Sequence, residues 1–196
     1  MSKITKGMFA AVLAVGMIGS VAGAATYEVD ASHSYVGFSV RHMVVSNTKG
    51  SFGEVKGTIE FDQDAPESIS ASAIVSVQSV DTKNEKRDKH LRGSDFFDVE
   101  KYPEITFETT RVEGSLPEVT LIGNLTIKDV TKEVSIPAEF TGPVTDPWGN
   151  VRIGFSGSTK INRKDYGISF SKVMDGGGLV VGDEVKISLE IEGIKK

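Results

Sequence analysis

Few side chains in this 196-residue sequence could carry out catalysis or bind a metal ion. The chain has no cysteine, which excludes thiolate metal sites and cysteine nucleophiles, and it has three histidines, His33, His42 and His90. His33 and His42 could bind a metal ion together with Asp88 or Asp95. Their spacing, however, matches no common ligand pattern. The sequence therefore predicts histidines at the surface or the rim of the fold rather than in a metal centre.

Two further motifs resemble catalytic elements in part. Ser32 precedes His33, but adjacent residues of a strand point to opposite faces and could not form a nucleophile–base pair. The run Asp-Gly-Gly-Gly at residues 175–178 lacks the lysine and the following helix of a phosphate-binding loop. We interpret this run as a connection before the last strand, and we predict no catalytic residue.

The first 24 residues have the features of a secretory signal peptide. Lys3 and Lys6 give a positive start, residues 8–18 form an apolar run, and a small-residue cleavage site ends at Ala24. The apolar run is shorter than the roughly 20 residues of a membrane-spanning helix. We therefore expect residues 1–24 to be removed, and residues 25–196 to form one periplasmic domain without stable membrane insertion.

The charge and composition of the mature chain limit its partners. Loss of the two lysines of the signal peptide changes the formal net charge from −5 to −7. An acidic surface disfavours nucleic acid and anionic membrane faces. Since the exported domain has no cysteine, it must be held together by packing alone. The sequence is compatible with a homodimer as well as with a monomer.

Apolar and polar residues alternate with a period of two along much of the mature sequence. The apolar stripes lie at residues 36–42, 55–61, 69–77, 105–109, 119–127, 134–140, 151–161 and 185–191. This pattern is typical of antiparallel strands with one face in a core. Turn residues separate the stripes at hairpin spacing, so an up-and-down order is the simplest topology. The sequence predicts an all-β fold of about eight antiparallel strands, either a barrel or a sandwich.

One highly charged stretch between the third and fourth stripes does not alternate, and it predicts a short helix at residues 85–92. Thr82 and Glu85 have the spacing of a capping box at its start. A short charged helix buries little of itself, so we expect Phe96 and Phe97 to anchor it. The helix is either a surface connection between two strands or a lid over one end of a barrel.

Several positions on the apolar stripes are unusually small. They are Gly57, Ala71, Ala73, Gly123 and Gly157. A small barrel that is filled by its own side chains needs bulk at such positions. Glycine also marks bends, but alanine does not. The two alanines therefore favour a hollow interior.

Sequence motifs along the chain, taken in order, resemble those of one protein family. Residues 90–107, H-L-R-G-S-D-F-F-D-V-E-K-Y-P-E-I-T-F, resemble the signature segment of the YceI-like family of polyisoprenoid-binding proteins. Residues 30–42, 123–132, 152–168 and 181–185 resemble further motifs of that family. Together these segments cover nearly the whole mature chain, which makes the resemblance specific.

The resemblance implies a secreted, periplasmic, lipocalin-like barrel with one short helix capping an end. Members of the family hold a long isoprenoid chain, such as a polyprenyl phosphate or a quinone tail, in an elongated apolar cavity. No catalysis is established for them. The expected partner is therefore a long-chain isoprenoid lipid that is bound non-covalently, with no other cofactor and no metal.

The candidate lipid-binding residues lie on the inward stripes and beside the helix. They are Phe38, Val40, Val55, Ile59, Ala71, Ala73, Val75, Phe96, Phe97, Phe107, Leu121, Leu125, Phe155 and Ile168. The candidate residues for a polar head group, at the mouth of the barrel, are Arg41, His42, Arg163 and Tyr166. Arg163 could instead pair with Asp165 or Asp95. Tyr166 replaces the family's usual phenylalanine and adds a hydroxyl group that could face solvent or the ligand.

Three functions fit these features. The first is a carrier that binds the lipid. The second is an enzyme that acts on such a lipid through Arg41, His42 or Asp165 at the mouth. The third is a filled barrel that serves only in protein interactions.

Overall fold

The computed structural model describes residues 23–173 and 179–196. The predicted signal peptide, except for its last two residues, and the glycine-rich run at residues 175–178 lie outside the described residues. None of the described helices is long and apolar enough to cross a membrane.

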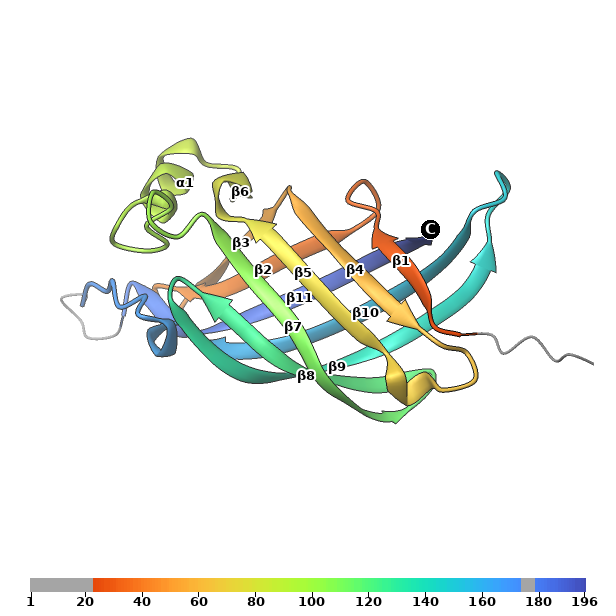
Figure 1. Ribbon diagram of the computed structural model, residues 1–196. Coiled ribbons are helices and arrows are strands. Elements are labelled where there is room, and N and C mark those ends of the chain that lie inside the picture. The colour runs from red at the N-terminus through yellow and green to blue at the C-terminus, as the bar shows by residue number, and fades with distance from the viewer. Residues whose placement is uncertain (1–22, 174–178) are drawn as a thin grey trace, which may run out of the picture.

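The described chain forms one closed antiparallel sheet with a single α-helix (Figure 1). The strands are β1 (Ala25–Val29), β2 (Tyr35–His42), β3 (Ser46–Phe52), β4 (Val55–Phe61), β5 (Ser70–Ser76), β6 (Val80–Asp81), β7 (Glu104–Ser115), β8 (Glu118–Ile127), β9 (Val130–Thr145), β10 (Val151–Asn162) and β11 (Val181–Lys195). Short 3₁₀ helices occupy Pro66–Ser68, Val77–Ser79 and Arg163–Tyr166.

These eleven segments make eight wall strands, because the first three wall strands are each broken once. In the first two wall strands, β1 pairs with β4 and β2 pairs with β3. In the second and third, β4 pairs with β5 and β3 pairs with β6. The breaks lie side by side, since Val36 is opposite Phe52 and Phe52 is opposite Val80. Each wall strand pairs with the next in sequence, which confirms the predicted up-and-down barrel of eight strands.

β11 closes the barrel by pairing with both parts of the first wall strand. The C-terminal half of β11 pairs with β1, where Tyr27 lies opposite Lys195. The N-terminal half of β11 pairs with β2, where His42 lies opposite Val181. On its other edge it pairs with β10. The wall therefore has no free edge between the first and last strands.

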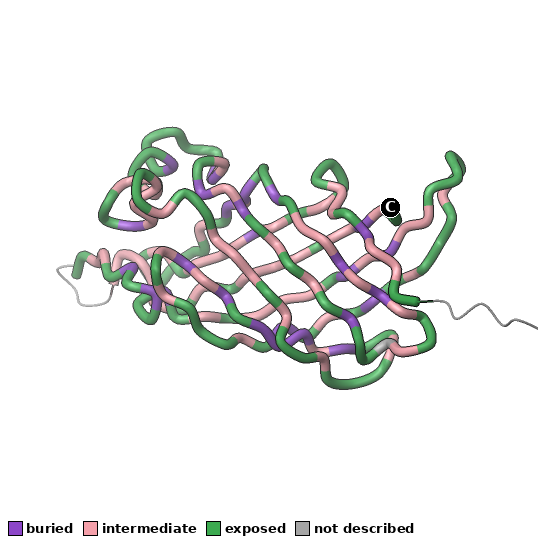
Figure 2. Tube along the Cα trace, in the orientation of Figure 1, coloured by how far each residue is buried: buried purple, intermediate pink, exposed green. Residues whose placement is uncertain are grey.

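Inward and outward positions follow the predicted period of two along the wall strands (Figure 2). At one end of the barrel, buried aromatic residues fill the interior. Phe140 lies between Phe61 and Phe155, with ring centroids at 4.7 and 5.1 Å. We call this the closed end. At the other end, α1 (Glu85–Arg92) lies over the wall beside the start of β7.

The helix begins at a different cap from the one the sequence predicts. Asn84 is the N-cap, and its side chain accepts a hydrogen bond from the backbone amide of Arg87. Thr82 is instead buried, and its amide and hydroxyl both donate to the carboxylate of Asp88. The capping-box prediction was therefore wrong, because Thr82 lies two residues before the N-cap and its side chain bonds to Asp88 within the helix.

Candidate ligand-binding cavity

A cavity of about 440 Å³ runs inside the barrel toward the end that carries α1. This volume falls within the range of roughly 300–1,000 Å³ of small-molecule sites. All fourteen candidate lipid-binding residues lie on its wall, from Leu121 and Phe155 near the closed end to Phe96 and Phe97 beside the helix. Since almost every lining side chain in the interior is apolar, the cavity suits an apolar ligand.

The small residues contribute to this space unequally. Ala71 and Ala73 line the cavity, as the sequence indicates. Gly123 does not, because a Cβ atom at that position would clash with the backbone oxygen of Glu108 and lie 2.7 Å from the ring of Phe107. Gly157 faces the cavity, but a Cβ there would lie 2.7 Å from the backbone oxygen of Pro137. The reading of Gly123 as open space was therefore wrong, since it makes room for a neighbouring ring.

Polar side chains line the cavity mainly at the open end, which we call the mouth. The charged side chains and histidines among them are Arg41, His42, Arg87, His90, Arg163 and Lys172. Two of these belong to α1, and Leu91 of the same helix also lines the cavity. The ring of His90 packs edge-on against Phe96 and Phe170, at 5.0 and 4.9 Å between centroids. This agrees with the interpretation of the helix as a lid.

Arg163 lies at the mouth but is held by the protein itself. It is only 4% exposed, and its guanidinium donates to the backbone oxygens of Gly182 and Ile168, each at 2.8 Å. It also donates to Asp183 at 3.1 Å. These contacts agree with the structural role offered as the alternative for Arg163, but its partner is Asp183 at the start of β11 rather than Asp165 or Asp95.

Tyr166 is the one candidate mouth residue that does not line the cavity. Its side chain is buried beside Ile168 and Phe96. This burial raises the pKa of the phenol. Tyr166 therefore packs in a hydrophobic cluster and does not line the cavity.

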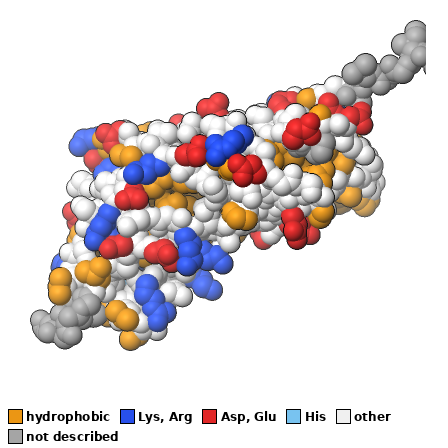
Figure 3. Space-filling model, turned by 90° about the horizontal axis from the view of Figure 1, so that it is seen from below, with side chains coloured by type: hydrophobic (Ala, Val, Ile, Leu, Met, Phe, Trp, Pro, Cys, Tyr) orange, Lys and Arg blue, Asp and Glu red, His pale blue; other side chains and the backbone are white. Residues whose placement is uncertain are grey.

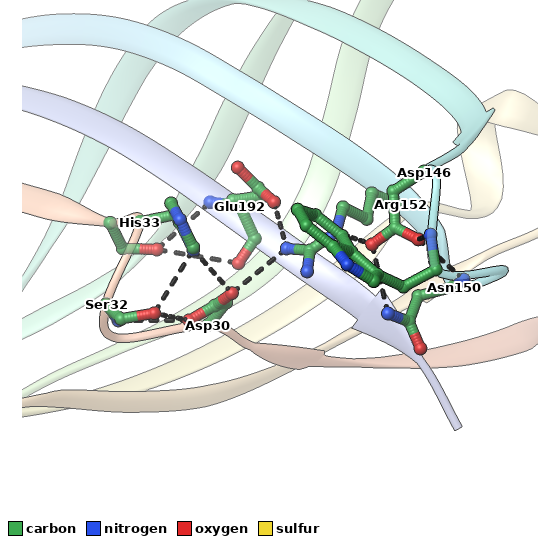
Figure 4. A network of polar contacts seen from close by, with 9 residues as sticks. Asp30, Ser32, His33, Asp146, Asn150, Arg152 and Glu192 are labelled. Carbon is green, nitrogen blue, oxygen red and sulfur yellow. Dashed lines mark hydrogen bonds and ion pairs between the residues drawn. The ribbon is translucent and has the colours of Figure 1, made fainter.

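A cluster of ion pairs and hydrogen bonds gathers around Arg152 (Figure 4). Arg152 of β10 donates to Asp146 at 2.7 Å, to Asp30 at 3.0 Å and to Glu192 of β11. Asp30 also accepts a hydrogen bond from the hydroxyl of Ser32. This ion-pair cluster ties β10 and β11 to the turn between β1 and β2, so it fastens the seam of the barrel near the closed end.

Ser32 and His33 lie in this cluster, which corrects one prediction from the sequence. The Ser32 hydroxyl lies 3.1 Å from His33 Nδ1, because residues 31–34 form a turn rather than a strand. Asp30 contacts the same ring nitrogen, at 2.8 Å. In a catalytic triad the serine and the carboxylate use different ring nitrogens. The contact is therefore a turn-stabilising one rather than a nucleophile–base pair.

The histidines do not come together as a metal centre. His33 precedes β2 and His42 ends it, and His90 pairs with Asp95. Asp30, His33 and Glu192 do lie close enough to share an ion. The guanidinium of Arg152 already contacts both carboxylates, so a fixed cation of the protein already engages them. The sequence indicated this cluster only through two of the family motifs, at residues 30–42 and 152–168.

The ion-pair cluster predicts a pH-dependent stability. Hydrogen bonds from Ser32 and His33 hold the pKa of Asp30 below its ordinary value. Burial alone would raise the pKa of Asp146, but hydrogen bonds from Arg152 and Asn150 outweigh this effect. The net result is a pKa below the ordinary value. A carboxyl group with a lowered pKa stabilises the fold above its unfolded pKa, about 3.9, and loses this effect as the pH falls below that value.

We therefore expect Asp146→Asn to lower the melting temperature at neutral pH and to matter progressively less below about pH 4. Thermal unfolding followed by circular dichroism across this pH range measures the difference. Glu113→Gln is the control, since Glu113 pairs with Arg111 on an exposed part of the wall. A difference for Asp146→Asn that did not change with pH would contradict the ionic role.

The fold and the cavity together define a class of protein, the up-and-down eight-stranded barrels that enclose an apolar cavity. Within that class the chain belongs to the YceI-like family, because the profile of the YceI-like domain matches residues 27–193. This confirms the resemblance seen in the sequence motifs.

Individual relatives agree with this assignment. A UPF0312 protein of Pseudomonas aeruginosa is 38% identical over 191 residues, which cover 95% of this chain and 97% of the relative. The solved YCEI protein of Campylobacter jejuni superposes with a TM-score of 0.67 at 31% identity, over 80% of this chain and 90% of that one. A polyisoprenoid binding domain from Saccharophagus degradans superposes with a TM-score of 0.66 at 16% identity, over 87% and 98% of the two chains, which is a likeness of fold alone.

Proposed function

We propose that this protein is a periplasmic carrier that holds one long-chain isoprenoid lipid, of the polyprenyl phosphate or isoprenoid quinone type, in the barrel cavity. The observation that carries this proposal is the shape of the site: an apolar cavity inside a closed barrel, with polar side chains gathered at one mouth. The fold shared with a solved polyisoprenoid binding domain supports the choice of lipid.

The energetics favour a long apolar ligand. Each methylene group that leaves water gains about 0.8 kcal/mol, so an isoprenoid chain is stable in an aqueous compartment only when it is sheltered. Its polar end cannot follow the tail without hydrogen-bonding partners. Arg41, His42 and Lys172 at the mouth are the groups we assign to that end.

We propose binding rather than catalysis because several mouth residues already have partners within the protein. Arg87 donates to Thr82, His90 contacts Asp95, and Arg163 is bonded to backbone oxygens. Asp165, a candidate catalytic residue at the sequence level, does not line the cavity. These contacts hold the mouth in shape and leave the apolar wall as the main contact surface.

The direct test is to purify the protein from the cells that make it, extract it with organic solvent and identify the lipids by mass spectrometry. We expect one class of isoprenoid lipid in near-equal amount to the protein, and much less of it with a cavity-filling variant. Recovery of only bulk phospholipid, at the same level from both proteins, would reject the proposal.

The periplasmic location has its own test. Mature protein recovered from the periplasm is expected to begin at Ala25 or Thr26, because β1 begins at Ala25 and the small-residue cleavage site ends just before it. Intact-mass measurement and N-terminal sequencing of this fraction give the answer. A folded product that begins at Met1 and stays in the cytoplasm would contradict export while leaving lipid binding untouched.

A further inference from the structure

The turn between β2 and β3 exposes three apolar side chains in a row. Met43, Val44 and Val45 project from it, with Val44 59% and Val45 79% exposed. Such a run is unusual on a hairpin turn, where polar and glycine residues dominate. Folding of the barrel gains little from these side chains, because they do not belong to its buried clusters.

The backbone of this turn is also poorly suited to its own residues. Met43 and Val44 both have positive φ values, 49° and 63°, and the amide of Val45 donates to the oxygen of His42 at 3.1 Å. Turns with positive φ at both central residues favour Asn-Gly, and a β-branched residue at positive φ is a true outlier. Strain of this kind is a reason to look for function.

The turn lies directly beside the mouth. The amide of Met43 donates to the oxygen of Val180 at 2.9 Å, and the amide of Val180 donates to Lys172 at the same distance. Val173, next along this segment, is also exposed. We call Met43, Val44, Val45 and Val173 the mouth tip. Its neighbours Arg41, His42 and Lys172 line the cavity opening.

The charges around the mouth tip are mainly positive. Within the described part of the chain, no carboxylate lies at salt-bridge distance from Arg41 or Lys172. The nearest acidic residues on β11 already have partners: Asp183 contacts Arg163 and Lys164, and Glu184 contacts Lys160. On the face seen in Figure 3, Lys and Arg side chains lie on the half toward the mouth, among acidic side chains, and the other end shows acidic side chains without basic ones.

From these observations we infer that the mouth tip docks on an anionic lipid bilayer, with its apolar side chains among the acyl chains and Arg41 and Lys172 at the headgroups. Exposed apolar groups flanked by basic ones bind membrane interfaces in this way. The acidic net charge disfavours anionic membranes for the molecule as a whole, but Arg41 and Lys172 beside the mouth tip have no carboxylate at salt-bridge distance in the described part of the chain. Docking here turns the cavity opening toward the membrane, and it does not depend on which ligand the cavity holds.

A second copy of the chain fits the mouth tip less well. A two-fold dimer through this surface would bring Arg41 and Lys172 of one copy against the same residues of the other. Like charges brought together across an interface oppose association. An anionic surface removes this repulsion, so the charge pattern selects a membrane over a dimer.

The test uses protein expressed from the full-length sequence, with its N-terminus fixed by mass spectrometry, and flotation with lipid vesicles. We expect binding to phosphatidylethanolamine vesicles that contain phosphatidylglycerol, much weaker binding to phosphatidylcholine vesicles, and release by salt. The variant is Val44→Asn with Val45→Thr, which should fold at least as well, because asparagine tolerates positive φ. We expect it to bind about tenfold more weakly.

Two matched controls separate docking from a general loss of apolar or basic surface. Val144→Thr removes a side chain that is similarly exposed, at 54%, but lies near the closed end, and it should bind as wild type does. Lys172→Gln should weaken binding about fivefold, whereas Lys56→Gln on the outer wall should not. Wild-type protein that stays unbound, or equal loss in Val144→Thr, would overturn the inference. So would a dimer in solution that the tip variant alone converts to a monomer.

Discussion

Replacing Ala73 with phenylalanine is expected to lower the affinity for a long apolar ligand by at least about a hundredfold. Ala73 lies on the cavity wall in the middle of β5, between Gly57 of β4 and Phe107 of β7. A ring at this position would project into the space that the ligand needs. Excluding as few as four methylene groups costs about 3 kcal/mol, which is more than two orders of magnitude in the dissociation constant.

Ile74→Phe is the matched control for this experiment, because Ile74 is the next residue of the same strand and points outward. Titration with a fluorescent long-chain ligand measures both affinities, and thermal unfolding checks that both variants fold. Ala73→Leu should give an intermediate loss of affinity, and it replaces Ala73→Phe in the experiment if the phenylalanine variant is unstable. Equal affinities for Ala73→Phe and Ile74→Phe would show that the ligand does not pass this part of the cavity.

The second large effect is on stability, and it concerns Arg163. Replacing Arg163 with glutamine removes the donors for three backbone oxygens and for Asp183. Removing one partner of a buried ion pair costs about 3–5 kcal/mol. Since Asp183 is partly exposed, we expect about 3 kcal/mol less free energy of unfolding, measured by urea denaturation.

Lys164→Gln is the control, because Lys164 bonds the other oxygen of the same Asp183 but is 43% exposed. Its loss should cost less than about 1 kcal/mol. The same variants test head-group recognition. If Arg163 only holds the mouth in shape, Arg163→Gln weakens a phosphorylated isoprenoid and its free alcohol equally. A loss confined to the phosphorylated lipid would place the head group at Arg163.

The period-two pattern predicted most of the barrel wall because each wall strand has one face in the interior. It did not predict β3, whose residues from Ser46 to Ser51 are small or polar and do not alternate in hydrophobicity. This strand is held by its pairing with β2 on one side and β6 on the other. Pairing energy of this kind depends on neighbours in space, so it leaves little trace in the sequence of the strand itself.

The cavity wall was predicted better than its polar surroundings for a similar reason. The inward direction of Ala73 or Leu121 follows from alternation alone. The position of Arg163 depends on where β11 begins, and the contact of Ser32 with His33 depends on a turn that the motif did not reveal. Gly123 shows a third limit, because a missing side chain can be filled by a ring from the adjacent strand.

The pairing of β11 with β1 and β2 also has a consequence for the order of folding. The two edges that it joins are more than 130 residues apart in sequence, as with Phe38 opposite Ile187. Contacts of such long range form late, because the entropy cost of closing a large loop must be met before the contacts can stabilise the chain. Until β11 arrives, β2 and β10 each present an unpaired edge to other chains. The partly folded chain is thus most prone to aggregation before β11 docks, and a chaperone that shields strand edges would help it most at that stage.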